Sequence, residues 1–110
     1  HPIGAQHHTH HGTTNAVCMP AVLRFNRPAV EGVLGQAAAY LGISGGFEGF
    51  AAFVDELNAG LGIPATLTAL GVRDPDLDAL TRSALSDPSV GGNPVPMTAE
   101  NTRALFEACL

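Results

Sequence analysis

The sequence contains no lysine and no tryptophan, and five arginines supply all of its fixed positive charge. Ten acidic residues bring the formal net charge to −5. A nucleic-acid-binding face or a membrane-surface helix needs a basic stripe, so this balance argues against both kinds of partner. No apolar run approaches the ~20 residues of a membrane span, and no basic segment followed by an apolar one indicates a signal peptide. We therefore expect a cytoplasmic protein.

Cysteine is also scarce. Cys18 and Cys109 lie near opposite ends of the chain, each within an apolar segment. Two cysteines in a chain of this size do not make a disulfide framework. Neither has a basic neighbour in sequence that would depress the pKa of its thiol. We expect both to be buried free thiols.

Apolar residues, in contrast, are abundant. They make up 45% of the 110 residues, while charged residues make up 14%. This composition favours a folded core, and the length is sufficient for one small domain. An isolated domain usually carries a more charged surface. The low charge therefore indicates that another domain or subunit covers part of the surface.

Glycine and proline divide the chain into helix-sized segments, and strand patterns are weak throughout. The periodicity predicts about five helices in one all-α unit, over residues 11–26, 27–42, 45–62, 75–87 and 98–110, with a short turn in 63–71 and a loop over 87–96. Pro20 should kink the first of these helices. Asp74 and Thr98 are predicted N-caps, and Gly42 and Gly62 are expected at C-terminal ends.

All five histidines lie within the first eleven residues, "HPIGAQHHTHH". On a continuous helix, His7 and His11 would share a face, with His10 beside them. Such a pair can bind a divalent metal. However, no "HExxH" pattern is present and no acidic residue precedes Glu31 to complete the ligand set. From the residues alone, a metal site and a solvated polar terminus both remain open.

The stretch "HPIGAQHHTHHGTTNAVCMPAVLRFN" resembles a segment of the iron-containing alcohol dehydrogenases. In that family, a histidine before Pro-Leu-Gly is followed ten residues later by a second histidine and a glycine, then by Asn-Ala, Leu-Pro and Phe-Asn. The matching residues here are His1, Pro2, Ile3, Gly4, His11, Gly12, Asn15, Ala16, Met19, Pro20, Phe25 and Asn26. The stretches "LGIPATLTALGV" and "GGNPVPMT" are similar to later family motifs, so the resemblance covers essentially the whole chain.

The resemblance implies a fold and a site. Residues 1–110 would form the C-terminal all-helical domain of the dehydroquinate synthase-like fold, cut within the active-site motif, while the N-terminal α/β domain would bind NAD or NADP. His11 corresponds to a ligand of the divalent metal, Fe²⁺ or Zn²⁺. His1 corresponds to a histidine beside the cofactor and metal, with a catalytic and cofactor-binding role. Helical spacing adds His7 as an auxiliary ligand, whereas the family pattern pairs His1 with His11.

The implied activity is hydride transfer between a small alcohol or aldehyde and a nicotinamide, with the segment inactive by itself. The implied partners are the protein's own N-terminal domain and further copies of the chain. One alternative is a maleylacetate reductase-type relative, although "HG" and "FN" favour the alcohol dehydrogenases. The other is a free-standing helical module that binds a metal or a partner through its histidine-rich end.

Overall fold

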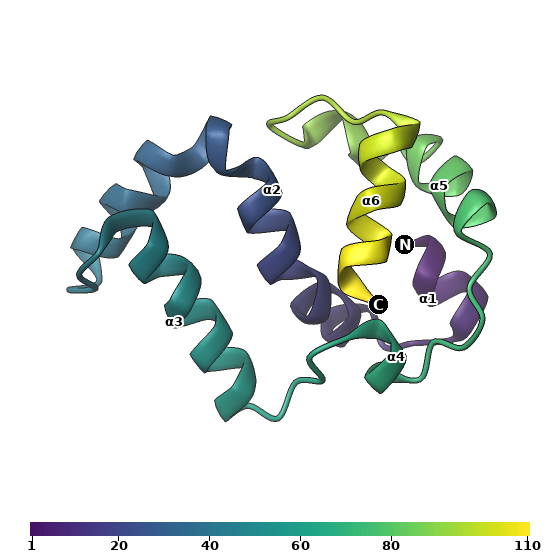
Figure 1. Ribbon diagram of the computed structural model, residues 1–110, viewed down its shortest axis with the longest axis horizontal. Helices are drawn as coiled ribbons and strands as arrows, with labels where there is room; N and C mark the ends of the chain where they lie inside the picture. The colour runs from purple at the N-terminus through teal and green to yellow at the C-terminus, as the bar shows by residue number, and fades with distance from the viewer.

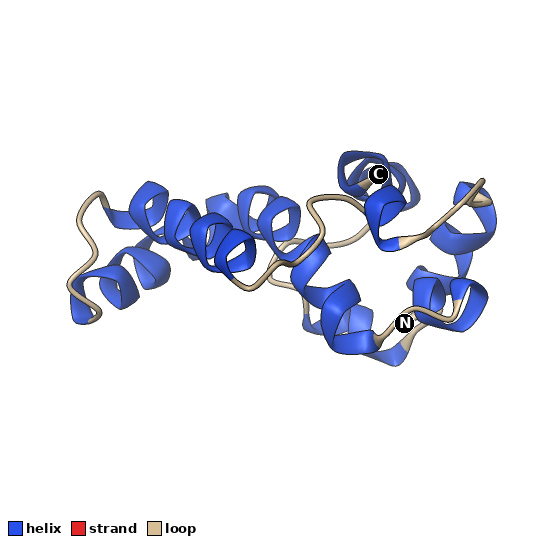
Figure 2. Ribbon diagram, turned by 90° about the horizontal axis from the view of Figure 1, so that it is seen from below, coloured by secondary structure: helices blue, strands red, loops and turns tan.

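The computed structural model describes all residues from 1 to 110 and contains only helices and loops, which confirms the all-α prediction (Figures 1 and 2). The elements are α1 (Pro2–His7), α2 (His11–Tyr40), α3 (Gly46–Gly60), α4 (Leu67–Leu70), α5 (Leu77–Leu85), the 3₁₀ helix η1 (Pro88–Gly92) and α6 (Ala99–Cys109). No helix is both long and apolar enough to cross a membrane.

The molecule has a body and an arm, and it measures 40 × 31 × 19 Å. The body holds α1, the first part of α2, and α4, α5 and α6, and the arm is the hairpin of the second part of α2 with α3 (Figures 1 and 2). The main buried cluster lies in the body and consists of Ile3, Val17, Leu67, Val72, Leu80 and Cys109. The arm buries a smaller set, Ala38, Phe47, Ala51 and Val54.

Helix α2 runs through the boundary at which the sequence predicts two helices. It is 30 residues long with Pro20 and Pro28 inside it, and it changes direction along its course (Figure 1). Proline at position 20 has no N–H to donate to the Ala16 carbonyl one turn earlier. The Asn58 side chain from α3 donates to that carbonyl instead, at 2.8 Å. This contact replaces the hydrogen bond that Pro20 cannot make.

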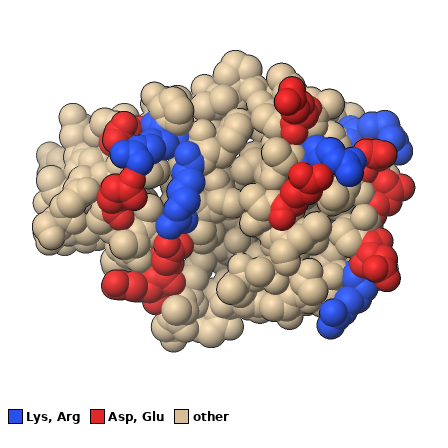
Figure 3. All heavy atoms as spheres, in the orientation of Figure 1, with Lys and Arg blue, Asp and Glu red and all other residues tan.

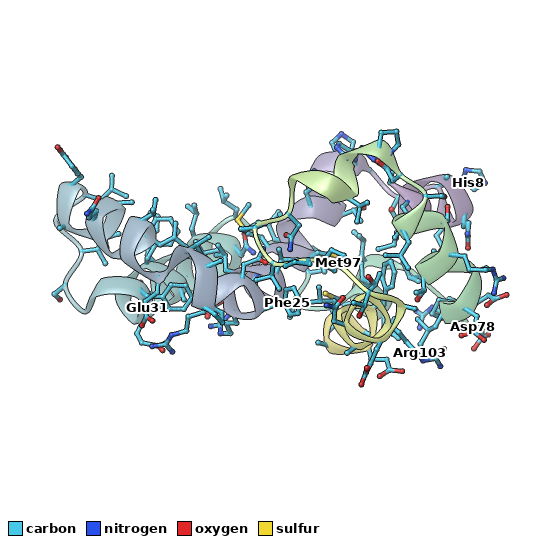
Figure 4. All side chains as sticks on the ribbon, turned by 90° about the horizontal axis from the view of Figure 1, so that it is seen from above. His8, Phe25, Glu31, Asp78, Met97 and Arg103 are labelled. Carbon is cyan, nitrogen blue, oxygen red and sulfur yellow. The ribbon has the colours of Figure 1, made fainter.

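Charged side chains gather on two flanks and leave the middle of one face uncharged (Figure 3). Two ion pairs join α2 to α3, Arg24 with Asp55 at 2.5 Å and Arg27 with Glu48. Arg103 on α6 pairs with Asp78 on α5, and Figure 4 shows these two side chains together at the outer end of the body. All these pairs are exposed, so each contributes little to stability.

The helix ends follow the predicted cap chemistry with one correction. Thr98 is the N-cap of α6, as predicted. Its side chain and that of Asn101 form a capping box, which was not predicted from the sequence. The N-cap of α5 is Asp76, which accepts a bond from the Ala79 N–H at 2.9 Å, rather than Asp74. Asp74 instead adopts a left-handed backbone with φ of 43°. The predicted loop over 87–96 contains η1, which begins after the N-cap Asp87.

Candidate active site

The five histidines are divided between two helices and the turn that joins them. Helix α1 ends at His7, because His8 takes a left-handed backbone with φ of 54°. His10 is then extended, and its ring accepts a bond from the Thr13 N–H as the N-cap of α2. His7 and His11 therefore do not share a helix, and the argument from helical spacing is wrong. His7 is half-buried with no bonding partner for Nε2.

The turn between α1 and α2 instead brings together the two histidines of the family pattern. The imidazoles of His1 and His11 stack with ring centroids 5.1 Å apart and planes 13° from parallel. Both residues are exposed at the surface of the body. Pro2 and Ile3, which follow His1, are buried and fix the start of α1 against the core. Two imidazoles at this surface can therefore meet a ligand from outside the segment.

Asp87 holds His1 from the other end of the chain. Its Oδ2 lies 2.6 Å from His1 Nδ1. A carboxylate can only accept, so Nδ1 donates and Nε2 of the neutral ring keeps its lone pair. Ser89 donates to Asp87 Oδ1 through its backbone N–H at 2.8 Å and its hydroxyl at 2.6 Å. These two bonds hold the pKa of Asp87 below its ordinary value.

His11 also has its ring fixed by a hydrogen bond. The Asn15 amide nitrogen, one turn later on α2, lies 3.1 Å from His11 Nε2. Because that amide can only donate, Nε2 is the acceptor and its lone pair is the one that a metal ion would take. Neutral imidazole is a ligand for both Fe²⁺ and Zn²⁺, so the donor fits the implied metal. No three His, Cys, Asp or Glu side chains of the chain gather into a metal-binding group.

A pair of asparagines joins two distant family motifs beside this site. Asn26 and Asn93 exchange two side-chain hydrogen bonds of 2.8 Å each. Asn26 is buried in α2, and Asn93 also donates to the Val95 carbonyl at 2.7 Å. The pair fixes the segment after η1 against α2. The similarity of "FN" and "GGNP" to family motifs marks both residues, but the sequence does not indicate that they bond to each other.

His1 and Asp87 line a groove of about 260 Å³ whose other walls are largely apolar. These walls are formed by Pro2, Val22, Ala84, Ser89, Val90, Asn93, Met97 and Leu105. Sequence reasoning finds His1 but not Asp87 or Ser89, because the segment over 87–96 shows only turn signals. The Asp87-Pro88 pair before η1 indicates only a helix N-cap. The hydrogen bond between Asp87 and His1 spans 86 positions, so it leaves no local sequence pattern.

Comparisons with known proteins match the whole length of the chain. The model of the "Fe-containing alcohol dehydrogenase family, C-terminal" matches residues 1–110. Lactaldehyde reductase of Escherichia coli K12 is 34% identical over 96% of this chain and 30% of its own length, and long-chain-alcohol dehydrogenase 1 of Geobacillus thermodenitrificans is 31% identical over 98% and 29%. A crystal structure of 1,3-propanediol oxidoreductase superposes with a TM-score of 0.90 at 29% identity, covering 100% of this chain and 31% of that one.

The fold and the matched residues define an all-helical segment that is similar to part of larger alcohol dehydrogenases and oxidoreductases. The chain belongs to the Fe-containing alcohol dehydrogenase family and corresponds to its C-terminal part. It spans about 30% of the length of the two relatives named above. Its relatives are alcohol dehydrogenases and oxidoreductases, and the structure neighbour has the same fold.

Proposed function

We propose that residues 1–110 form the metal-side wall of an NAD(P)- and divalent-metal-dependent alcohol dehydrogenase, which transfers hydride between a small alcohol or aldehyde and nicotinamide. The stacking of His1 on His11 carries the proposal. It places the two histidines of the family motif side by side, although the chain between them forms a helix and a turn. The segment alone is inactive, because dinucleotide binding and the remaining metal ligands belong to the N-terminal α/β domain.

In this proposal, His11 binds the metal through the Nε2 lone pair that now accepts from Asn15. When bound, the metal polarises the substrate oxygen and stabilises negative charge that develops on it. His1 uses the nitrogen left free by Asp87 to orient the cofactor ribose or the substrate, or to relay a proton. The apolar walls of the groove exclude water from one side of the reacting groups.

The N-terminal domain of the same protein is the proposed partner of this segment, and the complete protein is proposed to form homo-oligomers. The supporting observation is that much apolar surface is uncovered in residues 1–110. Only 15 of the 110 residues are buried, and seven large apolar side chains are exposed. Light scattering of the complete protein tests the oligomer. A monomer at all concentrations contradicts that part of the proposal.

The experiment for the activity uses the complete purified protein. Oxidation of short alcohols and reduction of aldehydes are measured with NAD(H) and NADP(H), and iron and zinc are measured by mass spectrometry. Maleylacetate is included as a substrate to test the reductase alternative. We expect His11→Ala to remove most of the bound metal and the activity. His8→Ala is the matched control, because His8 is exposed and points away from the body (Figure 4).

Two results would contradict the proposal. One is turnover by residues 1–110 alone, and the other is unchanged metal content in His11→Ala. The alternative of a free-standing histidine-rich module rested on His7, His10 and His11 sharing one helical face. The break between α1 and α2 removes that support.

A further inference from the structure

We propose that Asp87 is a positioning residue for His1: its carboxylate fixes the imidazole through Nδ1 in the stacked position on His11 and leaves Nε2 free to act. This inference rests on the proposed function, in which His1 contacts the cofactor or the substrate. Asp87 itself acts only through His1.

The two carboxylate oxygens of Asp87 have separate partners. Oδ1 accepts both bonds from Ser89, and Oδ2 faces His1 Nδ1 at 2.6 Å. Ser89 therefore fixes the plane of the carboxylate, and the carboxylate in turn fixes the ring. The Asp87 side chain is 21% exposed, whereas that of His1 is 58% exposed. The more buried partner thus holds the more exposed one.

The loop that carries Asp87 is tied to the helix that carries His11. The Val90 N–H donates to the Asp87 carbonyl at 3.1 Å, and the Asn93 N–H donates to the Val90 carbonyl at 3.2 Å. The side-chain amide of Asn93 donates one hydrogen bond to that of Asn26 on α2 and accepts one from it. Because α2 begins at His11, one helix sets the position of both imidazoles.

Stacking alone does not fix the His1 ring. A stacked imidazole can rotate in its own plane or flip about its Cβ–Cγ bond and still lie over its neighbour. The bond to Asp87 selects one orientation and places the hydrogen on Nδ1. Second partners of this kind orient functional imidazoles in other enzymes, and their loss lowers activity by one or more orders of magnitude.

The experiment separates this role from the capping of η1. Serine and asparagine at position 87 can both accept the Ser89 N–H bond that caps η1, but serine is too short to reach His1. In the metal-loaded complete protein, we expect Asp87→Ser to lower kcat at least tenfold, with KM and metal content within twofold of wild type and an unchanged melting temperature. Asp87→Asn should not recover the rate, because its single amide oxygen accepts from Ser89 and its NH2 group then faces Nδ1, to which it can only donate.

Two further measurements test the connection to His1. In a double-mutant cycle with His1→Ala, Asp87→Ser should have no additional effect on kcat. A crystal structure of Asp87→Ser should show the His1 ring turned away from its stacked orientation. Asp78→Asn is the matched control, because Asp78 is a carboxylate on α5 that pairs with Arg103 instead.

Wild-type kcat in Asp87→Ser, an equal loss in the His1→Ala background, or an unmoved His1 ring would each overturn the proposal. These outcomes differ from failure of the proposed function. If the wild-type protein has no activity with any alcohol or aldehyde, the function is wrong, and the crystal structure of Asp87→Ser still tests the positioning of His1.

Discussion

Cys18 on α2 and Cys109 on α6 both line a cavity of about 210 Å³ beside the main core. They are free thiols, Cys109 buried and Cys18 half-buried. The interaction with the Cys109 side chain lowers the pKa of the Cys18 thiol. The same interaction, together with burial, raises the pKa of Cys109. The pair therefore makes Cys18 the more reactive thiol without a basic neighbour.

This difference predicts the order of alkylation. In the complete protein at pH 7.5, iodoacetamide should modify Cys18 before Cys109, as measured by peptide mass spectrometry. Cys109→Ala removes the interacting thiol, so the pKa of Cys18 rises, its thiolate fraction falls and its reaction slows. Cys109→Ser keeps a donor and should react at close to the wild-type rate. Faster reaction of Cys18 in Cys109→Ala would show that access, rather than the interaction with Cys109, controls its reactivity.

For individual residues, the sequence predicts a role in the site where a motif marks the residue. It does not predict a role that depends on a partner far away in the chain. His1 and His11 are marked by the family pattern, and the structure brings them together. The helical spacing that pairs His7 with His11 assumes a continuous helix, whereas α1 ends at His7 and His8 adopts a left-handed backbone. Asp87 has no local signal, because its partner is 86 positions away.

In α2, a side chain from a second helix supplies a hydrogen bond that the backbone of α2 lacks. Pro20 leaves the Ala16 carbonyl without its intrahelical partner, and Asn58 of α3 supplies the bond. A buried carbonyl without a partner is costly. The sequence predicts a kink at Pro20, and α2 continues through this position. It does not predict a single 30-residue helix, because the compensating donor lies on another element.

We expect Asn58→Ala to lower the free energy of unfolding by about 1–3 kcal/mol, because the Ala16 carbonyl loses its partner. In a Pro20→Ala background, the backbone N–H of position 20 can bond to that carbonyl, so the same substitution should cost less. Urea unfolding of residues 1–110, followed by circular dichroism, measures both differences. Equal costs in the two backgrounds would show that Asn58 contributes through packing rather than through this bond.

The turn from α2 to α3 depends on one glycine of α3. A Cβ on Gly49 would lie 1.9 Å from the Ser44 carbonyl oxygen and 2.9 Å from its carbon, so the turn backbone would have to move. We expect Gly49→Ala to destabilise the segment by about 1–3 kcal/mol, as other overpacked positions do. Gly60→Ala is the matched control in the same helix, because nothing lies within 4 Å of its added Cβ. It should be neutral or slightly stabilising in the same urea experiment.

Across the whole molecule, the body and the arm have separate buried clusters. The body cluster joins residues from α1, α2, α4, α5 and α6 with Val72, while the arm buries only α2 against α3 (Figure 2). The exposed apolar side chains Val33, Tyr40, Leu41, Phe53, Leu57 and Leu61 all belong to the arm and its adjoining turns. The sequence predicts the all-α class and incomplete burial. It does not predict the division into two parts, which depends on the bend in α2.

Because regions with fewer buried apolar contacts open more readily, α3 should exchange its amide hydrogens faster than α5 and α6. Hydrogen exchange of residues 1–110, read by mass spectrometry, measures this order. Val54→Ala should speed exchange in α3 and leave α5 and α6 unchanged, since Val54 is buried only in the arm. Leu80→Ala, a cavity in the body cluster, should speed exchange in α5 and α6 and lower stability by about 2–5 kcal/mol. Uniform acceleration by either substitution would mean that the body and the arm unfold as one cooperative unit, and that the bend in α2 transmits stability between them.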